Sequence, residues 1–497
     1  MRVAFVNPQG NFDPRNSYLA SHPDFGGQLV YVREVARVLE KTGHQADILT
    51  RRVVDPEWPE FAGETDAYPG HENVRILRVP CGPDGFLPKE ELWPYLGTEF
   101  VPNLLSFYER EDSLPDTVTS HYGDGGLCAV LIEDRTGIPF SFTAHSLGAQ
   151  KMDKMGVRRR DIAETDKKYH FSKRIVAERL AMNRSRLNVT STGQERFVQY
   201  THNAYRGAVD PTDGDHFAAV PPGVAMHIFD KNSRADDEGA VRGHVLACLE
   251  RDLDPERVGL PCIVASSRLD PKKNHRALVE AFASSPELRE RANLLVITRG
   301  LDDPLRDPGG ASDEERPLLD TLISTVDRSN LWGGISAFGL SGQTALAALY
   351  RWGAETGGVF CLPAEYEPFG MTVVEAMAVG LPVVVTQNGG PQETTDGGRA
   401  GLLADPHDPG DIAAKLLRLL SDRQTWKAYA DKGLERARDL YNWRRTAEGY
   451  LKLAGEAARG ERGGDPSFPI PEFARRPAPA GLPRLRGWET QGERPAG

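Results

Sequence analysis

Short apolar segments alternate with amphipathic segments in two separate series along this chain, and that alternation restricts the fold more than any other feature. The first series has apolar segments at 2–6, 46–49, 74–79, 117–120 and 140–144. The second has them at 262–265, 294–298, 359–362 and 383–385, with helical patterns at 275–282, 346–350 and 372–378. Apolar runs separated by helical patterns are typical of parallel sheets covered by helices. We therefore expect an α/β protein with two Rossmann-like domains.

The length of the chain supports the same division. Its 497 residues are too many for one hydrophobic core. We expect an amino-terminal domain built from 1–222 and completed by 443–460, and a second domain built from 223–442 that includes the linker. Parallel sheets bind ligands beyond the carboxyl ends of their strands, so two such domains predict a shared interdomain cleft. Residues 461–497 are rich in proline, glycine and arginine, and we expect a disordered tail there.

Composition excludes several classes of protein. A formal net charge of −11 disfavours a nucleic-acid binder. The five cysteines are scattered and contain no CxxC pair, which indicates reduced thiols and no cysteine metal site. The first residues do not resemble a signal peptide, and no apolar run approaches the length that spans a membrane. We expect a cytoplasmic protein that binds neither membranes nor nucleic acid.

Charged residues cluster at the ends of the expected strands of the second series. Arg268 and Lys273 follow the strand at 262–265, and such cations can neutralise a diphosphate. Glu367 and Glu375 flank Gly370 after the strand at 359–362, where carboxylates can accept hydrogen bonds from sugar hydroxyls. Each residue alone has an ordinary surface role as its alternative. Together with the NGGP loop at 388–391, they predict a site for a nucleotide-sugar.

The first half carries a different set of polar residues. Gly27 and Gln28 open a helix, where glycine lets a phosphate or sugar approach the amides, although an ordinary tight turn fits equally well. His145 follows the strand at 140–144, and Asp124 either forms a turn or orients an acceptor hydroxyl. Three cations suggest an anionic acceptor as a set, although each alone fits a solvated side chain: Lys89, Lys151 and Arg174.

No residue pattern demands a metal ion or a carboxylate nucleophile. Asp213 and Asp215 form a DxD sequence, but it lies in a polar stretch that predicts a turn. No pair of carboxylates of the glycosidase type is evident. We therefore predict no bound metal site, and we expect Mg²⁺ at most to stimulate the protein.

The motifs resemble those of one enzyme family. The chain contains NPQGNFDP, DFGGQLVYV, FLPKEELWPYL, HYGDGG, HSLGAQK, SSRLDPKKN and EPFG followed by NGGP. It resembles the retaining GT-B glycosyltransferases of family 4, and most closely the sucrose-phosphate synthases in their bacterial single-module form. The likeness extends from Arg2 to about Leu453. It implies two Rossmann-like domains facing each other across a deep cleft, and transfer of glucose from UDP-glucose to fructose 6-phosphate.

The resemblance also implies roles for individual residues. Arg268 and Lys273 would hold the diphosphate, Glu375 the ribose and Glu367 the transferred sugar, which His145 would also contact. The implied catalytic residues are His145, Arg268, Lys273 and Glu367. The implied donor-binding residues are Gly27, Arg268, Lys273, Leu340, Glu367, Phe369, Gly370, Met371, Thr372 and Glu375. The implied acceptor-binding residues are Gly27, Gln28, Lys89, Tyr122, Asp124, Lys151 and Arg174.

The same resemblance implies partners and leaves alternatives. UDP-glucose would be a co-substrate and no further cofactor is expected. A separate sucrose-phosphate phosphatase would act on the product, because no DxDxT motif follows the transferase region. The alternatives are a mannosylfructose-phosphate synthase using GDP-mannose, a sucrose synthase using free fructose, and a non-catalytic nucleotide-sugar sensor. The three cations of the first half argue against a neutral acceptor.

Overall fold

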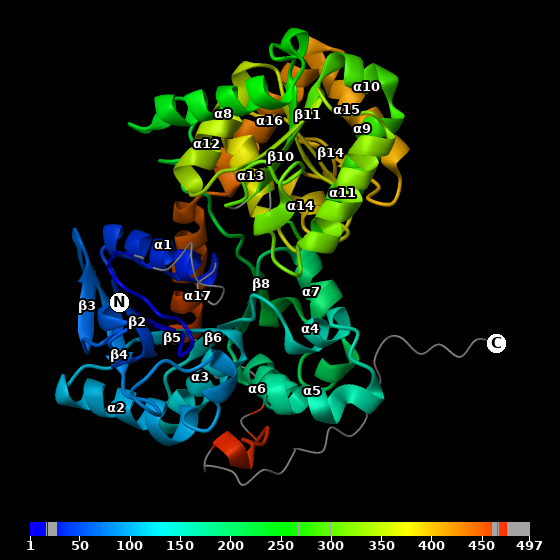
Figure 1. Cartoon of the computed structure of the whole chain (residues 1–497). Coiled ribbons are helices and arrows are strands. Elements are labelled where there is room, and N and C mark those ends of the chain that lie inside the picture. Colours follow the sequence, from blue (N-terminus) through cyan, green and yellow to red (C-terminus); the bar gives the residue numbers. More distant parts are fainter. Residues whose placement is uncertain are drawn as a thin grey trace. The chain divides into compact units, whose positions relative to one another are not determined.

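The computed structural model describes residues 1–15, 17, 27–266, 269–298, 300–459, 465 and 467–474. The chain divides into two compact units. Unit 1 comprises Met1–Pro221 and the chain from Trp443 onward, and unit 2 comprises Pro222–Asn442. Both units are α/β structures built on largely parallel sheets (Figure 1). Among the described helices, none combines the length and apolar character needed to cross a membrane.

Unit 1 contains an eight-stranded sheet with the order β3-β4-β2-β1-β5-β6-β7-β8, in which only the β3–β4 pairing is antiparallel. Its strands are β1 (Arg2–Val6), β2 (Gln45–Arg51), β3 (Thr65–Tyr68), β4 (His71–Val79), β5 (Thr117–His121), β6 (Phe140–Thr143), β7 (Leu187–Thr190) and β8 (Phe217–Ala219). Its α-helices are α1 (Gly27–Lys41), α2 (Val101–Arg110), α3 (Tyr122–Thr136), α4 (Gly148–Lys154), α5 (Ile162–Tyr169), α6 (Phe171–Arg184), α7 (Gly193–Gln199) and α17 (Trp443–Arg459).

Both faces of this sheet are covered by helices. Successive side chains of a strand point to opposite faces, and β1 divides accordingly between two cores. Val3 and Phe5 join the core under α1 and α17, whereas Ala4 and Val6 join the core under α2, α3 and α6. The helix α17 lies beside α1 (Figure 1), and the Tyr31 hydroxyl donates to the Tyr450 hydroxyl at 3.1 Å. The last long helix is therefore an integral part of unit 1.

Residues 467–474 are ordered, although a disordered tail was expected over 461–497. Residues 467–474 include the short helix η10 (Glu472–Ala474), and Phe468, Ile470 and Phe473 pack against the core of unit 1. Ala474 is 1% exposed, and a β-carbon on Gly97 would lie 1.7 Å from its carbonyl oxygen. Apolar side chains spaced through a polar, proline-rich stretch gave too weak a pattern to predict this docking. Apart from Asp465, the remainder of the expected tail lies outside the described residues.

Unit 2 contains a six-stranded, fully parallel sheet with the order β11-β10-β9-β12-β13-β14. Its strands are β9 (Cys262–Ser266), β10 (Asn293–Thr298), β11 (Ile335–Gly339), β12 (Val359–Leu362), β13 (Val383–Thr386) and β14 (Leu402–Ala404). Its α-helices are α8 (Glu238–Asp252), α9 (His275–Ser284), α10 (Pro286–Arg291), α11 (Arg316–Arg328), α12 (Gln343–Glu355), α13 (Met371–Ala378), α14 (Pro391–Thr394), α15 (Pro409–Leu420) and α16 (Arg423–Leu440).

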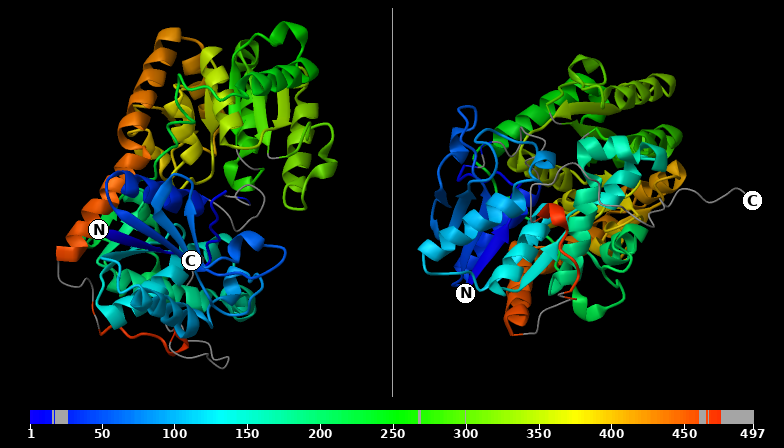
Figure 2. Two further views of the ribbon diagram at one scale, coloured as in Figure 1. Left: turned by 90° about the vertical axis from the view of Figure 1, so that its left-hand side faces the viewer. Right: turned by 90° about the horizontal axis from the view of Figure 1, so that it is seen from below.

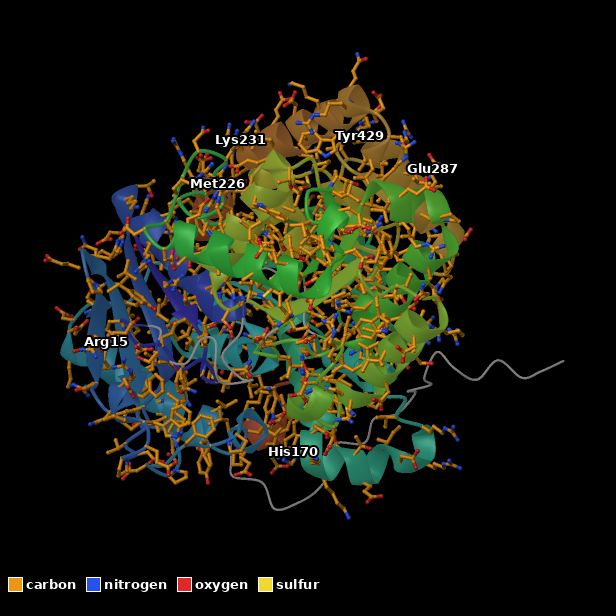
Figure 3. All side chains as sticks on the ribbon, turned by 45° about the horizontal axis from the view of Figure 1, so that its top comes forward. Arg15, His170, Met226, Lys231, Glu287 and Tyr429 are labelled. Carbon is orange, nitrogen blue, oxygen red and sulfur yellow. The ribbon has the colours of Figure 1, made fainter. Side chains whose placement is uncertain are left out.

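Helices cover both faces of this second sheet as well (Figure 2). Cys262 and Val264 point into one core with α12 and α13, whereas Ile263 and Ala265 point into the other with α9, α11 and α15. Charged side chains occupy the periphery: Lys231 and Glu287 are exposed at the edge of the unit (Figure 3). With both faces buried, ligands can reach the sheet only at the loops beyond the ends of its strands.

Candidate active site

The loops that follow β9 and β12 bring two of the sequence-predicted donor residues of unit 2 together. Lys273 ends the short helix η8 (Pro271–Lys273) after β9, and Glu367 lies in the loop between β12 and α13. The Lys273 Nζ atom lies 2.6 Å from Glu367 Oε2, and both side chains are largely but not fully buried. The pair therefore links two loops whose sequence positions are 94 residues apart. Arg268, the other predicted diphosphate ligand, lies outside the described residues.

The NGGP loop supports the loop that carries Glu367. The Gly390 amide donates to the Glu367 carbonyl oxygen at 2.8 Å, and the Glu367 amide donates to the Asn388 carbonyl oxygen at 3.2 Å. Gly389 has a φ of 93°, and a β-carbon there would lie 2.3 Å from the Glu367 carbonyl oxygen. The Gly390 amide is therefore engaged by the Glu367 loop. These glycines allow two backbones to touch, which side chains would prevent.

Replacing Gly390 by alanine is expected to lower turnover about 100-fold, because displacing catalytic groups by about 1 Å has effects of this size. The new β-carbon would lie 2.3 Å from the Pro368 carbonyl oxygen and 2.6 Å from the Phe369 α-carbon, so the Glu367 loop must move. Gly243→Ala in α8 is the matched control, since a β-carbon there has no atom within 4 Å. Steady-state kinetics of both variants check this, and equal turnover of Gly390→Ala and wild type would contradict it.

The amino terminus of α13 faces the same loop. Gly370 precedes the helix with a φ of 94°. Within the described residues, the amides of Phe369, Gly370, Met371 and Thr372 donate no hydrogen bond. Amides at a helix start favour anionic or strongly polar ligand groups. The Phe369 ring itself packs edge-on against Tyr441 at 5.6 Å, so this residue offers only its backbone to a ligand.

Glu375 lies on the second turn of α13 and is 6% exposed. Burial raises the pKa of its carboxyl to about 7, and a hydrogen bond with Gln343 offsets part of that effect. A carboxylate held in a dry site has unused acceptor capacity for ligand hydroxyls. Leu340, after β11, is half-buried, and its amide donates to the Thr298 carbonyl oxygen at 3.0 Å. Because the amide is engaged, only the carbonyl oxygen of Leu340 could form a backbone hydrogen bond with the base of a nucleotide.

In unit 1, the carboxyl ends of β5 and β6 bring together several predicted acceptor and catalytic residues. The Tyr122 and His145 rings lie 5.1 Å apart, and both residues have positive φ, 60° and 53°. Gln9 Nε2 donates to Asp124 Oδ1 at 3.2 Å, and burial raises the pKa of Asp124 to about 6. Asp124 Oδ2 is buried with no partner in the described part of the chain. A buried acceptor without a partner favours the second of the two roles expected for Asp124, orienting a ligand hydroxyl, over forming a turn.

Arg174 on α6 joins this cluster through a buried carboxylate. Its Nε donates to Glu178 Oε1 at 2.8 Å, and its Nη2 donates to the Ser146 carbonyl oxygen at 2.7 Å. Glu178 is fully buried and also accepts from the Gly148 amide at 2.9 and 3.0 Å. The carboxylate thus fixes Arg174 and the start of α4 together. Sequence reasoning overlooked Glu178, although its place four residues after Arg174 on a helix predicts contact.

The other predicted acceptor residues lie on separate elements. Gly27 is exposed at the start of α1, and Gln28 Nε2 donates to Asn7 Oδ1. Lys89 is half-buried in the short helix η2 (Lys89–Glu91). The Lys151 Nζ atom lies 5.4 Å from the centre of the Tyr169 ring. The convergence of these residues on one phosphate stays a prediction.

The DxD sequence forms a turn, as expected. Asp213 caps the short helix η6 (Gly214–His216) by accepting from the Asp215 amide at 3.0 Å. Within the described residues, no group of three or more histidine, cysteine, aspartate or glutamate side chains could hold a metal ion.

Comparison with known proteins identifies the two units. Residues 252–436 match the model of glycosyl transferases group 1, and residues 1–205 match that of the sucrose synthase first GT-B domain. A probable sucrose-phosphate synthase of Thermosipho melanesiensis is 40% identical over 453 residues, which cover 91% of this chain and 96% of that protein. The maize sucrose-phosphate synthase is 32% identical, and the match covers 93% of this chain but 48% of the maize protein.

The solved structures agree on the fold. A sucrose-phosphate synthase from Thermosynechococcus elongatus superimposes with a TM-score of 0.64 at 24% identity, covering 91% of this chain and 98% of that one. The expected architecture of two Rossmann-like domains is thereby confirmed. The chain belongs to the sucrose-phosphate synthase family and is a hexosyltransferase with the GT-B fold.

Proposed function

We propose that the protein transfers glucose from UDP-glucose to fructose 6-phosphate, with retention of anomeric configuration, giving sucrose 6-phosphate and UDP. The observation that carries this proposal is the Lys273–Glu367 pair beside the loop that leads into the open amino terminus of α13, the helix that carries Glu375. It offers a cation for a diphosphate, free amides for sugar oxygens and a buried carboxylate for ribose hydroxyls. Family membership supports the choice of sugar and acceptor.

The geometry also supports a division of labour in the reaction. The acceptor hydroxyl would attack the anomeric carbon while its bond to the diphosphate oxygen breaks, and the proton would pass to a phosphate oxygen. Lys273 would leave Glu367 in part to stabilise the charge that develops on the diphosphate. Glu367, relieved of its partner, would accept hydrogen bonds from the transferred sugar. The Gly390 hydrogen bond would keep Glu367 in place during this exchange.

The acceptor phosphate would bind in unit 1. Glu178 balances the charge of Arg174, so Arg174 would contribute directed hydrogen bonds to the phosphate but little net positive charge. Lys89 and Lys151 would contribute the remaining positive charge, and Asp124 Oδ2 would accept a fructose hydroxyl. This division explains why a free sugar would bind more weakly than its phosphate.

An assay of the full chain with several donors tests the proposal. The donors are UDP-glucose, ADP-glucose, GDP-glucose and GDP-mannose, each offered with fructose 6-phosphate. We expect sucrose 6-phosphate from UDP-glucose, identified by nuclear magnetic resonance with the glucosyl linkage in the α configuration. Preferential use of GDP-mannose would assign the protein to mannosylfructose phosphate synthesis instead. Tight UDP-glucose binding without any product would indicate a sensor.

A further inference from the structure

His121 is a fully buried residue that contacts the predicted catalytic His145. It is the last residue of β5, where it pairs in register with Thr143 of β6. His145 follows two residues later, beyond the end of β6. The His121 Nδ1 atom lies 2.8 Å from His145 Nε2, and the two rings are nearly parallel. The two strand ends therefore bring the rings into direct hydrogen-bond contact.

The surroundings hold both rings in place. The Tyr31 ring meets the His145 ring edge-on at 5.4 Å and the His121 ring at 6.2 Å. The Phe5 ring stacks on His121 at 6.0 Å. The Ser146 amide donates to the Ala144 carbonyl oxygen at 2.6 Å, which closes a tight turn around His145 with its positive φ. A backbone held in a rare conformation at a predicted site is typical of a preorganised group.

Burial determines the protonation state of the two imidazole rings. Burial lowers the pKa of His145 to about 4, and burial together with the neighbouring imidazole holds the pKa of His121 well below its ordinary value. Both rings are therefore neutral near pH 7, and each carries one N–H group. One of these N–H groups forms the bond between the rings. The only open question is which ring donates it.

The environment of His121 Nε2 indicates which ring donates the hydrogen bond. His121 Nε2 is buried and has no partner within the described residues. If His145 donated to His121, a buried Nε2–H donor would remain unpaired. If His121 donates from Nδ1, its Nε2 carries only an unpaired lone pair. Unpaired buried donors are rarer in proteins than acceptors with spare capacity. The second arrangement is therefore favoured, and it leaves the His145 proton on Nδ1.

We infer that His121 is a positioning residue that fixes the ring and tautomer of His145, so that His145 presents Nδ1–H as a donor to a substrate oxygen. The inference rests on the proposed function for the statement that His145 contacts substrate. It gives the fully buried first residue of the HYGDGG motif a role in positioning His145. It also means that His145 serves as a hydrogen-bond donor and not as a base.

A pair of isosteric variants tests the role in catalysis. The asparagine side-chain nitrogen occupies the position of histidine Nδ1, so His121→Asn can still donate to His145, whereas His121→Leu cannot. We expect His121→Leu to lower kcat about 10- to 100-fold and His121→Asn to stay within about 3-fold of wild type, a range typical of lost orienting contacts. The affinity for UDP, which depends on unit 2, is expected to stay unchanged in both variants. Equal kcat values for the two variants would overturn the inference.

A spectroscopic measurement separates this inference from the proposed function. In wild-type protein labelled with ¹⁵N-histidine, the His145 signals can be assigned by their loss in His145→Gln. We expect a protonated Nδ1 and an unprotonated Nε2 for His145 at neutral pH. The reverse pattern would refute the tautomer even if the enzyme is fully active. The expected pattern in a protein that forms no sucrose 6-phosphate would retain the tautomer and reject the proposed function.

Discussion

Lys273→Ala is expected to lower kcat by about 100- to 1,000-fold, the usual effect of removing one group that stabilises developing negative charge. The Lys273 ammonium lies 2.6 Å from Glu367, at the loop where the donor diphosphate would bind. Its loss removes that charge and leaves the Glu367 carboxylate without its partner. Steady-state kinetics with saturating UDP-glucose and fructose 6-phosphate measure the effect.

Lys272 provides the matched control for this experiment. It is adjacent in sequence and carries the same charge, but its side chain is exposed. Lys272→Ala is therefore expected to keep wild-type kcat, and both variants should keep the thermal midpoint of the wild type within a few degrees. If Lys273→Ala and Lys272→Ala behave alike, Lys273 has no special role in turnover.

Glu375→Gln is expected to weaken UDP-glucose binding about 10- to 100-fold while stabilising the fold at alkaline pH. A neutral amide loses the charge-assisted hydrogen bonds that a carboxylate makes to ribose hydroxyls. Burial raises the pKa of Glu375 from about 4.5 to about 7, so the folded protein holds a proton that the unfolded chain releases. Stability is therefore lost as the pH rises from about 4.5 to about 7. A shift of this size corresponds to about 3 kcal/mol, which the glutamine variant should recover above pH 7.

Denaturant unfolding at pH 5 and pH 8 and calorimetric titration with UDP-glucose check both parts. The stabilisation by Glu375→Gln should be larger at pH 8 than at pH 5. Glu435→Gln is the control, because Glu435 is an exposed carboxylate on α16. It should change neither quantity. A Glu375→Gln variant that binds UDP-glucose as wild type does would remove Glu375 from the donor site.

The sequence predicted those buried elements that consist of continuous apolar residues. The bounds of β1 and β12 match the expected ones because continuous apolar residues mark them. The short strand β7 was not predicted, since Asn188 and Thr190 interrupt its apolar pattern. Asn188 is nevertheless fully buried, where its Nδ2 donates to the Met182 carbonyl oxygen at 3.0 Å. Such tertiary hydrogen bonds cannot be read from a local pattern.

The candidate site shows the same limit. Lys273, Glu367 and Glu375 could be chosen because charged residues at strand ends in this spacing indicate a ligand. The support that Gly390 gives to the Glu367 loop was not predicted, because it is a backbone contact and side-chain chemistry carries no sign of it. His121 was overlooked because only the pairing of β5 with β6 brings it to His145.

The central claim is that unit 2 supplies an activated sugar to a phosphorylated acceptor bound by unit 1. Its most direct test is the ratio of kcat/KM for fructose 6-phosphate to kcat/KM for free fructose, measured with UDP-glucose. Charge-assisted contacts to a phosphate contribute about 1.5–3 kcal/mol each, so two or more predict a ratio of about 100 or higher. Equal kcat/KM values for the two acceptors would contradict the account.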